Sequence, residues 1–599
     1  MPLSTALLQV LTAFAVSLAL VPISRYTALR YGFVAKPRAD RWHHRPTALL
    51  GGVAIVLTAL GLHLAFIGVA AAPVLLVGTA AMFVLGLVDD IVSLKPVTKL
   101  VFEIAVASVF AFFDYRLGWF DSQTLDTLVT IFWIVGFTNA FNLLDNMDGL
   151  CAGLGVIAGA VVLAGFAIGG FEGPEVTHLA LLLGATAGFL VYNVNPASIF
   201  MGDSGSLFIG LNLAVLTLGR DMPTRASADL LSIMAAPMFI LLVPILDTAL
   251  VTLSRWATGR SAAQGGRDHS SHRLVAIGLS ERSAVFVLWV LAALGGALGI
   301  TLSHSPGEFA SLASAGFILG VMIFAVYLAH VRVYDEDDTV LTRAGGITPI
   351  VVDFVYRRRI GEVLLDVCLT ALAYYSAYRL RFGAPAEFRI YFPQFLRSLP
   401  LVVGVQVVSL YASDGYRGVW RYFGMMDSLA FVRGVGLGTL VNISVLVYAY
   451  RFEAYSRGVF IIHAALLMLF LTGSRASFRL ISEFVQRRTQ RGMRVVIYGA
   501  GDVAASAVHD ILRRREGSFR MLGFIVEDPS MERTRMQGYP VLGSYGALLE
   551  LIEQQRVDLV VLTQLIDVDR LTQLHEVCAE RRVSLERLHF HLDQLVAAS

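Results

Sequence analysis

The chain is poor in charged residues. Asp, Glu, Lys and Arg make up only 15% of its 599 residues, whereas 56% are hydrophobic and the mean hydropathy is +0.68. Such a composition excludes an ordinary soluble multidomain protein. The net charge of +2 gives no reason to expect nucleic acid as a partner.

Cysteine is also scarce. The three cysteines, Cys151, Cys368 and Cys578, show neither a CxxC motif nor paired spacing, so we expect no disulfide framework and no zinc site. The first apolar run, residues 4–20, has no basic region before it, and we therefore expect a retained first span rather than a cleaved signal.

Long apolar runs dominate what is present, and they predict a polytopic α-helical membrane protein. About eleven runs precede residue 331, and a second block holds about four more. The expected spans are residues 4–24, 50–70, 73–88, 100–114, 127–141, 150–170, 178–194, 204–218, 230–253, 283–303, 311–330, 361–380, 397–412, 428–450 and 457–473.

Basic residues cluster after the first, third and ninth runs, which predicts an external N-terminus and a cytoplasmic position for the loops that follow odd-numbered spans. From about residue 490, short strand-like and helical patterns alternate, as in a cytosolic α/β domain. We expect four parts: a membrane domain at 1–335, a charged linker at 336–359, a four-span block at 360–475 and a Rossmann-like domain at 490–599.

A run of amides and carboxylates, Asn139 to Leu150, lies at the seam between two apolar segments. Asn139, Asn142 and Asp145 are three residues apart, so a helical end would place them on one face. Acids at the edge of the hydrocarbon are costly without a partner. The run therefore predicts a metal ion, a polar substrate, or both.

Two more acidic positions adjoin apolar runs. Asp89 and Asp90 end the third run, with Lys99 nearby, and suit a general base or a magnesium-linked phosphate site. Asp203 lies between glycines where the eighth run begins, a favourable position for a cation or phosphate. The alternatives are an interfacial helix cap for the pair and an N-cap with Ser204 for Asp203.

Two histidines, His269 and His272, lie three residues apart in a basic loop that ends in Arg273. They could share a helical face, and the arginine could bind phosphate oxygens; a solvated loop is the alternative. No HExxH motif accompanies them, so zinc is not expected. Hard oxygen ligands, asparagines and arginines on one face favour magnesium and a diphosphate.

Taken together, residues 1–330 resemble the polyprenyl-phosphate N-acetylhexosamine-1-phosphate transferases, which include undecaprenyl-phosphate GlcNAc-1-phosphate transferases and phospho-MurNAc-pentapeptide translocases. Five blocks in order carry the resemblance: His43-x-x-Pro46-Thr47 with Gly51-Gly52, Asp89-Asp90 with Lys99, Asn139–Leu150, Asn193 with Phe200-Met-Gly-Asp203-x-Gly-Ser206, and Asp268-His269-x-x-His272. The family transfers a sugar 1-phosphate from a UDP-sugar to a polyprenyl phosphate, releases UMP and so initiates a lipid-linked glycan.

The resemblance implies roles for individual residues. Asp203 would coordinate Mg²⁺, or Mn²⁺, with Asp145 close by, and Asp89 or Asp90 would deprotonate or hold the acceptor phosphate. The expected catalytic residues are Asp89, Asp90, Asp145 and His269. The expected uracil contacts are Asn146, Met147, Asp148 and Phe200, and the expected contacts for the donor's phosphates or sugar are His269, His272 and Arg273. The other expected substrate-binding residues are Lys99, Asn139, Asn142 and Asn193.

The sequence departs from the family at two places. Members often read Pro-Thr-Pro-Arg-Gly-Gly in the first loop, where this chain has Ala48, Leu49 and Leu50 in place of the second Pro, the Arg and a Gly. Asn146 stands where many members have Gly, which bears on the choice of donor.

The second half resembles the N-terminal half of membrane-bound nucleotide-sugar 4,6-dehydratases, through Tyr416-Arg-Gly-Val-Trp-Arg421 and an α/β domain. Gly499 and Gly501 form a GxGxxA turn after a strand, and Glu527 ends the next strand, which is a Rossmann-like nucleotide-binding pattern. The alternative is a fold that binds nothing or acts as a docking module. No lysine follows Lys99, so we expect no dehydratase Tyr-x-x-x-Lys pair and a regulatory or scaffolding role.

We therefore expect a bacterial inner-membrane enzyme that acts on the cytoplasmic face, with a UDP-N-acetylhexosamine, undecaprenyl phosphate and the bilayer as its partners. A nucleotide-sugar-modifying enzyme and a second copy of the chain are further candidate partners. The rival classes are a transporter, which predicts internal repeats and charges at the bilayer midplane, and a non-catalytic scaffold for polysaccharide assembly.

Overall fold

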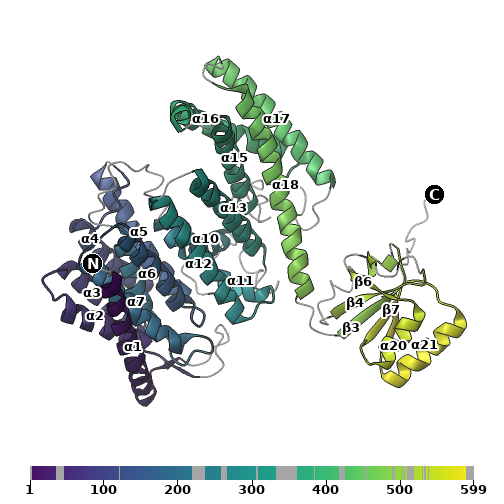
Figure 1. The fold of residues 1–599 in the computed structure, drawn as a ribbon, viewed down its shortest axis with the longest axis horizontal. Helices are drawn as coiled ribbons and strands as arrows, with labels where there is room; N and C mark the ends of the chain where they lie inside the picture. The colour runs from purple at the N-terminus through teal and green to yellow at the C-terminus, as the bar shows by residue number, and fades with distance from the viewer. Residues whose placement is uncertain are drawn as a thin grey trace. The chain divides into compact units, whose positions relative to one another are not determined.

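The structure is a computed structural model in which the chain forms two compact units, Met1–Arg479 and Leu480–Ser599, each described here by itself (Figure 1). The described residues are 3–35, 46–120, 122–218, 237–257, 266, 268–304, 308–331, 360–382, 385–416, 425–451, 455–488 and 493–588, with gaps in the last range at 502, 505, 509–518, 529–530, 532–533 and 537–538.

The first unit is helical. Its first twelve labelled helices are α1 (Leu3–Tyr31), α2 (Gly51–Phe66), α3 (Pro73–Val92), α4 (Pro96–Phe112), α5 (Gln123–Leu144), α6 (Leu150–Ile168), α7 (Pro174–Asn193), α8 (Gly202–Leu216), α10 (Leu242–Ala257), α11 (Ser270–Ala276), α12 (Glu281–His304) and α13 (Glu308–His330). Pro73, Pro96 and Pro174 each begin a helix, where a residue without an N–H loses no intrahelical hydrogen bond.

Helix α8 lies at the centre of this bundle and packs against α2, α3, α5 and α6. All of its residues from 204 to 216 are buried. Close packing requires small residues on its neighbours: a Cβ on Gly52 of α2 would lie 2.3 Å from the Gly205 nitrogen. The helix is therefore surrounded by protein along its length, and its first residues are held in fixed positions.

The second helical block of this unit consists of α15 (Ile360–Arg381), α16 (Pro385–Ala412), α17 (Met425–Tyr450) and α18 (Arg457–Arg488). An ion pair joins two of these helices, because Arg475 of α18 donates to both carboxylate oxygens of Asp366 in α15, at 2.6 and 2.7 Å. Both side chains are fully buried. Tyr416, from the motif that resembles the dehydratases, is buried as well.

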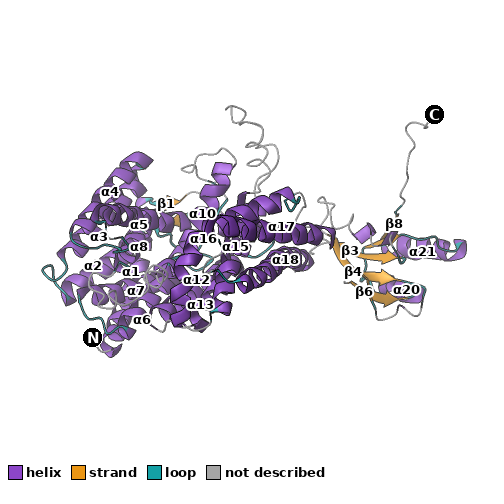
Figure 2. Cartoon of the chain, turned by 90° about the horizontal axis from the view of Figure 1, so that it is seen from above, coloured by secondary structure: helices purple, strands orange, loops and turns teal. Residues whose placement is uncertain are grey.

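The second unit is an α/β domain (Figure 2). Its sheet contains β3 (Met493–Tyr498), β4 (Phe519–Ile525), β5 (Arg535–Met536), β6 (Tyr539–Gly543), β7 (Leu559–Leu562) and β8 (Ser584–Arg587), and its labelled helices are α20 (Tyr545–Glu553) and α21 (Val568–Arg581). The strand order is β5-β6-β4-β3-β7-β8, and all neighbours are parallel except β5 and β6.

The sheet of this unit is buried on both faces. Val495 and Ile497 of β3 belong to one apolar cluster, and Val496 and Tyr498 belong to another that includes Leu548 of α20. Alternate side chains of a strand point to opposite faces. This arrangement confirms the predicted α/β domain with parallel strands.

The predicted helical membrane architecture is also confirmed. Ten of the described helices are long and apolar enough to cross a membrane, and three shorter apolar helices accompany them; each of the fifteen predicted runs overlaps a described helix. The protein is a multi-pass membrane protein. The proposed division at 335, 359 and 475 stays a prediction, as does the orientation of the loops.

Candidate functional site

The end of α3 is attached to the start of α8 through Asp90. Its two carboxylate oxygens accept the backbone N–H groups of Asp203 and Ser204, at 2.8 and 3.0 Å. These are free N–H groups of the first helical turn, so Asp90 caps α8. Gly202 has a φ of +73°, and a Cβ there would lie 2.6 Å from the Asp90 carboxylate, which explains the glycine before Asp203.

Asp89, adjacent in sequence, has different partners. One oxygen accepts the Leu94 N–H at 2.6 Å, and the other accepts the Lys99 ammonium at 2.9 Å. The same ammonium donates to Asp203 at 2.5 Å. The ends of α3, α4 and α8 therefore bring a lysine and two acids together, and the three side chains are only partly buried.

The end of α5 completes this cluster. Asn142 donates to the Ser206 hydroxyl at 3.0 Å and also hydrogen-bonds the Asp203 carboxylate. Asp145 follows as the C-cap of α5, three residues later. Of the three evenly spaced polar residues, Asn142 is thus in contact with the predicted metal ligand Asp203, and the position of Asp145 near it stays a prediction.

The third residue of that face, Asn139, contacts an acid that was not among the predicted site residues. Its amide donates to Glu103 of α4 through a short hydrogen bond and to the Val135 carbonyl at 3.0 Å. Glu103 is 1% exposed. A lone acid inside an apolar helix, one turn after Lys99, was the available signal.

The turn after α5 contacts the loop between α7 and α8. Asp148 accepts the Ala197 N–H at 2.8 Å and the Asn195 amide at 3.2 Å. Asn193 accepts the Gly149 N–H at 3.1 Å and donates to the Ile199 carbonyl at 3.0 Å. Both polar groups of the Asn193 side chain are therefore used to connect these two loops.

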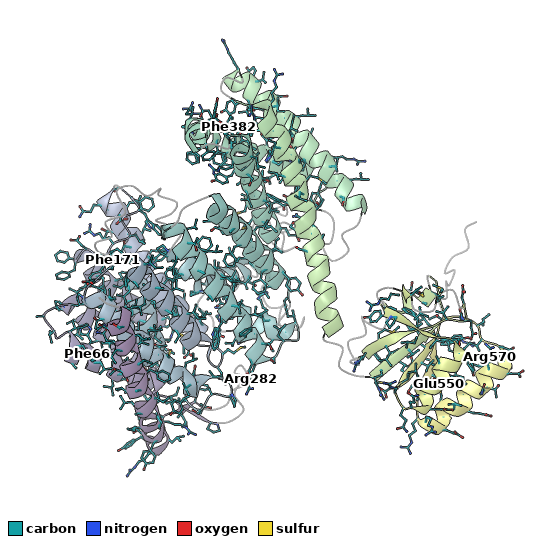
Figure 3. The ribbon with its side chains drawn as sticks, in the orientation of Figure 1. Phe66, Phe171, Arg282, Phe382, Glu550 and Arg570 are labelled. Atoms are coloured by element: carbon teal, nitrogen blue, oxygen red, sulfur yellow. The ribbon has the colours of Figure 1, made fainter. Side chains whose placement is uncertain are left out.

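The same two loops reach α12 and the first loop. Arg282, labelled in Figure 3, donates to the Asn195 carbonyl at 3.0 Å. Phe200, half-buried, donates its N–H to the Ala48 carbonyl at 2.8 Å. Of the predicted first-loop motif, Thr47 and Ala48 form β2, which pairs with β1 (Val34–Ala35); His43 lies outside the described residues.

The predicted histidines lie at the start of α11. His269 Nδ1 is 2.8 Å from a carboxylate oxygen of Asp247 in α10, and the other oxygen accepts the Ser270 N–H and hydroxyl at 2.7 and 2.6 Å. Asp247 was missed because it sits within an apolar run. His272 is buried beside His269, with ring centroids 5.7 Å apart.

This segment is connected to the α5 turn, since the Ser271 hydroxyl donates to Asn146 at 2.9 Å. Met147, next to Asn146, is 5% exposed. The predicted uracil and phosphate positions therefore belong to one connected region.

Arg273 is held by carbonyl groups. Its guanidinium donates to the carbonyls of Leu328, Ala329 and Val331 at 2.9–3.1 Å, and also to Ser254 and to the Asp268 carbonyl. Arginine near a helix C-terminus satisfies carbonyls in this way. The predicted phosphate contact would require Arg273 to exchange these partners, and it stays a prediction.

Asp268 connects the segment before α11 to α10. Its carboxylate accepts two hydrogen bonds from Arg255 of α10, at 2.7 and 2.8 Å. Burial raises the pKa of Asp268, but the Arg255 guanidinium outweighs it and holds this pKa below its ordinary value. The loop before α11 is therefore anchored by a bidentate ion pair.

The acids of the cluster fit a magnesium ion whose other ligands are water, with phosphate oxygens in place of water when a substrate binds. Among the described residues, no three His, Cys, Asp or Glu side chains gather to hold a metal by themselves. Mg²⁺ is ordinarily held by one or two carboxylates together with phosphate oxygens and water. Asp203 and Asp89 already converge on one cationic group, the Lys99 ammonium, so their hard oxygens suit that arrangement.

In the second unit, the predicted nucleotide-binding residues lie at the carboxyl ends of β3 and β4. Gly499 and Gly501 have φ values of +133° and +86°. Glu527 accepts hydrogen bonds from the Tyr498 hydroxyl at 2.7 Å and, at 3.1 Å, from Arg570 of α21, which is labelled in Figure 3. The three residues share the edge where parallel sheets bind ligands, but Glu527 already has two partners.

Comparison with known proteins gives two family matches: glycosyl transferase family 4 at residues 72–220 and a CoA-binding domain at residues 412–585. The chain is 33% identical to a probable undecaprenyl-phosphate N-acetylglucosaminyl 1-phosphate transferase of Bacillus subtilis, over 48% of this chain and 84% of that protein.

Two further relatives are similar over part of the chain. A decaprenyl-phosphate N-acetylglucosaminephosphotransferase of Mycolicibacterium smegmatis is 32% identical over 51% of this chain and 84% of its own length. A phospho-N-acetylmuramoyl-pentapeptide-transferase of Limosilactobacillus reuteri is 33% identical over 36% of this chain and 74% of its own length.

Proposed function

The chain belongs to glycosyl transferase family 4, and on that basis we propose that it transfers an N-acetylhexosamine 1-phosphate from a UDP-sugar to a polyprenyl phosphate and releases UMP. The GlcNAc transferases among its relatives make UDP-GlcNAc the first donor to test. Undecaprenyl phosphate is the proposed acceptor, and the product would initiate a lipid-linked glycan.

The observation that carries the proposal is the cluster of Asp89, Lys99 and Asp203, contributed by three helices. In the reaction, an oxygen of the acceptor phosphate forms a bond to the sugar-bearing phosphorus of the donor. The bond from that phosphorus to the bridging oxygen breaks, and UMP leaves with the electron pair. Positioning and neutralisation of charge supply most of the rate enhancement in such displacements.

The adjacent aspartates receive different roles in this proposal. Asp90 is a positioning residue, because both its oxygens are occupied by the N-terminus of α8. Asp89 is the candidate base, since a side chain can exchange its partner Lys99 more readily than a helix end can move. Asp89 would take the proton of the acceptor phosphate or hold that phosphate in line.

Asp203, with Asp145 close by, is the proposed ligand pair for Mg²⁺ or Mn²⁺. Such an ion, when bound, would offset the negative charge of the donor diphosphate. Lys99 contributes positive charge from the protein itself, and Asn142 fixes the orientation of the Asp203 carboxylate. These contacts support a site for two phosphorylated substrates.

The donor would extend from this cluster toward α11. Asn146, Met147, Asp148 and Phe200 are the proposed uracil positions, and His269 and His272 are the proposed contacts for phosphates or sugar. Asp247 supports His269 by accepting a hydrogen bond from its ring, which would leave the other ring nitrogen for the substrate. The hydrogen bond between Ser271 and Asn146 supports treating both groups as one donor site.

For the second half of the chain, we propose a regulatory or partner-docking role on the cytoplasmic face, with a nucleotide-sugar-modifying enzyme as the candidate partner. The sequence has no lysine after Lys99, so residues 100–599 hold no Tyr-x-x-x-Lys pair. Nucleotide binding at Gly499, Gly501 and Glu527 remains part of the proposal, and it would require Glu527 to exchange a present partner.

The test is UMP release by the purified full-length protein with undecaprenyl phosphate, magnesium and a panel of UDP-N-acetylhexosamines. We expect turnover that requires both lipid and metal and is lost in Asp203→Ala. Asp114→Asn is the matched control, because Asp114 is an exposed acid after α4 whose contact with Arg116 is a loose 3.9 Å. Equal turnover by wild type and Asp203→Ala would refute the proposed site.

A further inference from the structure

The Lys99 ammonium lies between two acids that the reaction needs. It donates to Asp89 and Asp203 at 2.9 and 2.5 Å. A divalent cation bound to Asp203 would place a second positive charge next to this ammonium. Like charges at such separations repel strongly in a partly buried site, so we expect the ammonium to leave Asp203 when the metal binds, to keep Asp89 and to have a donor available for another acceptor.

Glu103 offers such an acceptor. One of its oxygens accepts the hydrogen bond from Asn139, and the other, Oε1, is buried without a hydrogen-bond partner among the described residues. Residues four apart on a helix are neighbours, and helical side chains lean toward the N-terminus. The Glu103 side chain is therefore directed to the turn that carries Lys99, and the two side chains interact electrostatically.

We propose that Glu103 is the second partner of Lys99. When a divalent cation binds Asp203, the ammonium leaves that carboxylate and donates to Glu103 Oε1. Glu103 is thus a positioning residue for the metal-bound state. This inference rests on the proposed assignment of Asp203 as a metal ligand.

The unpartnered oxygen is the observation that favours this exchange. A buried carboxylate oxygen without a donor is costly, and the exchange gives it one. Asn139 can keep its hydrogen bonds to the other Glu103 oxygen and to the Val135 carbonyl, because the ammonium would take only Oε1. The ammonium would then donate to Asp89 and Glu103 instead of Asp89 and Asp203.

The experiment is a titration of the purified full chain with Mn²⁺ alone, with the free ion measured by electron paramagnetic resonance. Glu103→Gln keeps an oxygen for Asn139 and removes the charge that would receive Lys99. We expect its dissociation constant for Mn²⁺ to rise on the order of tenfold, which corresponds to a modest ion-pair contribution. Asp114→Asn, the same chemical change just beyond α4, should bind as the unchanged chain does.

A double-mutant cycle separates this role from simple support of Asn139. Lys99→Met removes the competing ammonium, so we expect tighter Mn²⁺ binding and no further effect of Glu103→Gln in that background. An equal weakening by Glu103→Gln with and without Lys99 would overturn the exchange, because it would show that Glu103 acts independently of the ammonium.

Asp203→Ala distinguishes failure of this inference from failure of the proposed function. Loss of Mn²⁺ binding in Asp203→Ala, together with no effect of Glu103→Gln, would leave the metal site intact as a proposal and refute the exchange. Retained binding in Asp203→Ala would refute both. Absence of saturable binding by the unchanged chain would also overturn the exchange, since we place the metal on Asp203 before any substrate arrives.

Discussion

At the scale of single residues, two adjacent aspartates are distinguished by what they contact. Both oxygens of Asp90 accept backbone N–H groups of α8, whereas Asp89 accepts one backbone N–H, from Leu94, and contacts the flexible end of a lysine. The sequence alone predicted that the pair is functional, but it did not predict which aspartate has which role, because neighbouring acids are equivalent until their partners are known. Glu103 and Asp247 were missed for a related reason, since an acid within an apolar run has no motif around it.

Asparagine substitutions should separate the two aspartates. Asp89→Asn should lower the rate of UMP release by about 10²–10⁴-fold, as expected for loss of a base, and should cost less stability than Asp90→Asn, because the amide oxygen can still accept the Leu94 N–H. Asp90→Asn should reduce stability by about 1–2 kcal/mol, because the amide NH₂ cannot accept the second N–H of the α8 cap. Thermal unfolding in detergent and the UMP assay measure the two effects. An unchanged melting temperature in Asp90→Asn would contradict the capping role.

At the scale of the helix, the sequence was most informative. All fifteen predicted apolar runs overlap described helices, because a span needs about 20 apolar residues and this requirement is visible without any contact information. Helix ends were predicted less well: α1 and α18 continue for several residues beyond the expected spans. Polar residues extend these helices, so the hydropathy signal ended before the helix did.

Two glycines of α2 provide a matched test of helix packing. Gly52→Ala should reduce both stability and UMP release, because its Cβ would meet the backbone of Gly205, which cannot move aside without displacing α8. Gly61→Ala has nothing within 4 Å of its Cβ and should be neutral or stabilising by up to about 1 kcal/mol. Both are measured by thermal unfolding, and equal effects at the two positions would show that α2 and α8 do not pack as described.

The buried pair of Asp366 and Arg475 predicts a large effect in the four-helix block. Asp366→Asn would remove the charged carboxylate that accepts two hydrogen bonds from the Arg475 guanidinium and should cost about 3–5 kcal/mol. Replacing both residues, by Asp366→Leu with Arg475→Met, should cost less because both charges of the pair are then removed. The fraction of protein that remains folded after detergent extraction and heating compares the two variants. A double variant less stable than Asp366→Asn would contradict this interpretation.

At the scale of the whole molecule, the sequence predicted a helical membrane part followed by an α/β domain, and both are present. The change from long apolar runs to short alternating patterns made this division visible. The pairing of site residues across the chain could not be predicted in the same way. Asp90 and Asp203 are 113 residues apart, and only the packing of α3 against α8 joins them.

Two units with separate cores predict separate responses to acid. In the second unit, hydrogen bonds from Arg494 lower the pKa of Asp558 to about 2 from its ordinary value of 3.8. A lowered pKa stabilises the folded state above about pH 4, and this contribution is lost as the pH falls from about 4 through about 2. Because the pair is more than one-third exposed, the effect should be below about 1 kcal/mol.

This acid sensitivity can be measured by hydrogen exchange of β3 and β7 in the full chain between about pH 5 and pH 2, the range that brackets both pKa values. Asp558→Asn should show less change over this range than the unchanged chain, once the intrinsic exchange rates are subtracted. An identical pH response in both proteins would assign the acid sensitivity to other groups.

The burial of α8 from residue 204 to residue 216 has a consequence for how the protein is made. In the assembled fold this segment is stabilised by contacts with its neighbours and not with lipid, so its final packing depends on those helices. Helices α2, α3, α5 and α6 precede α8 in the chain and are synthesised before it. We therefore expect the segment carrying Asp203 to pack against helices that are already in place, and a chain halted before residue 202 to leave the apolar surfaces of those four helices uncovered.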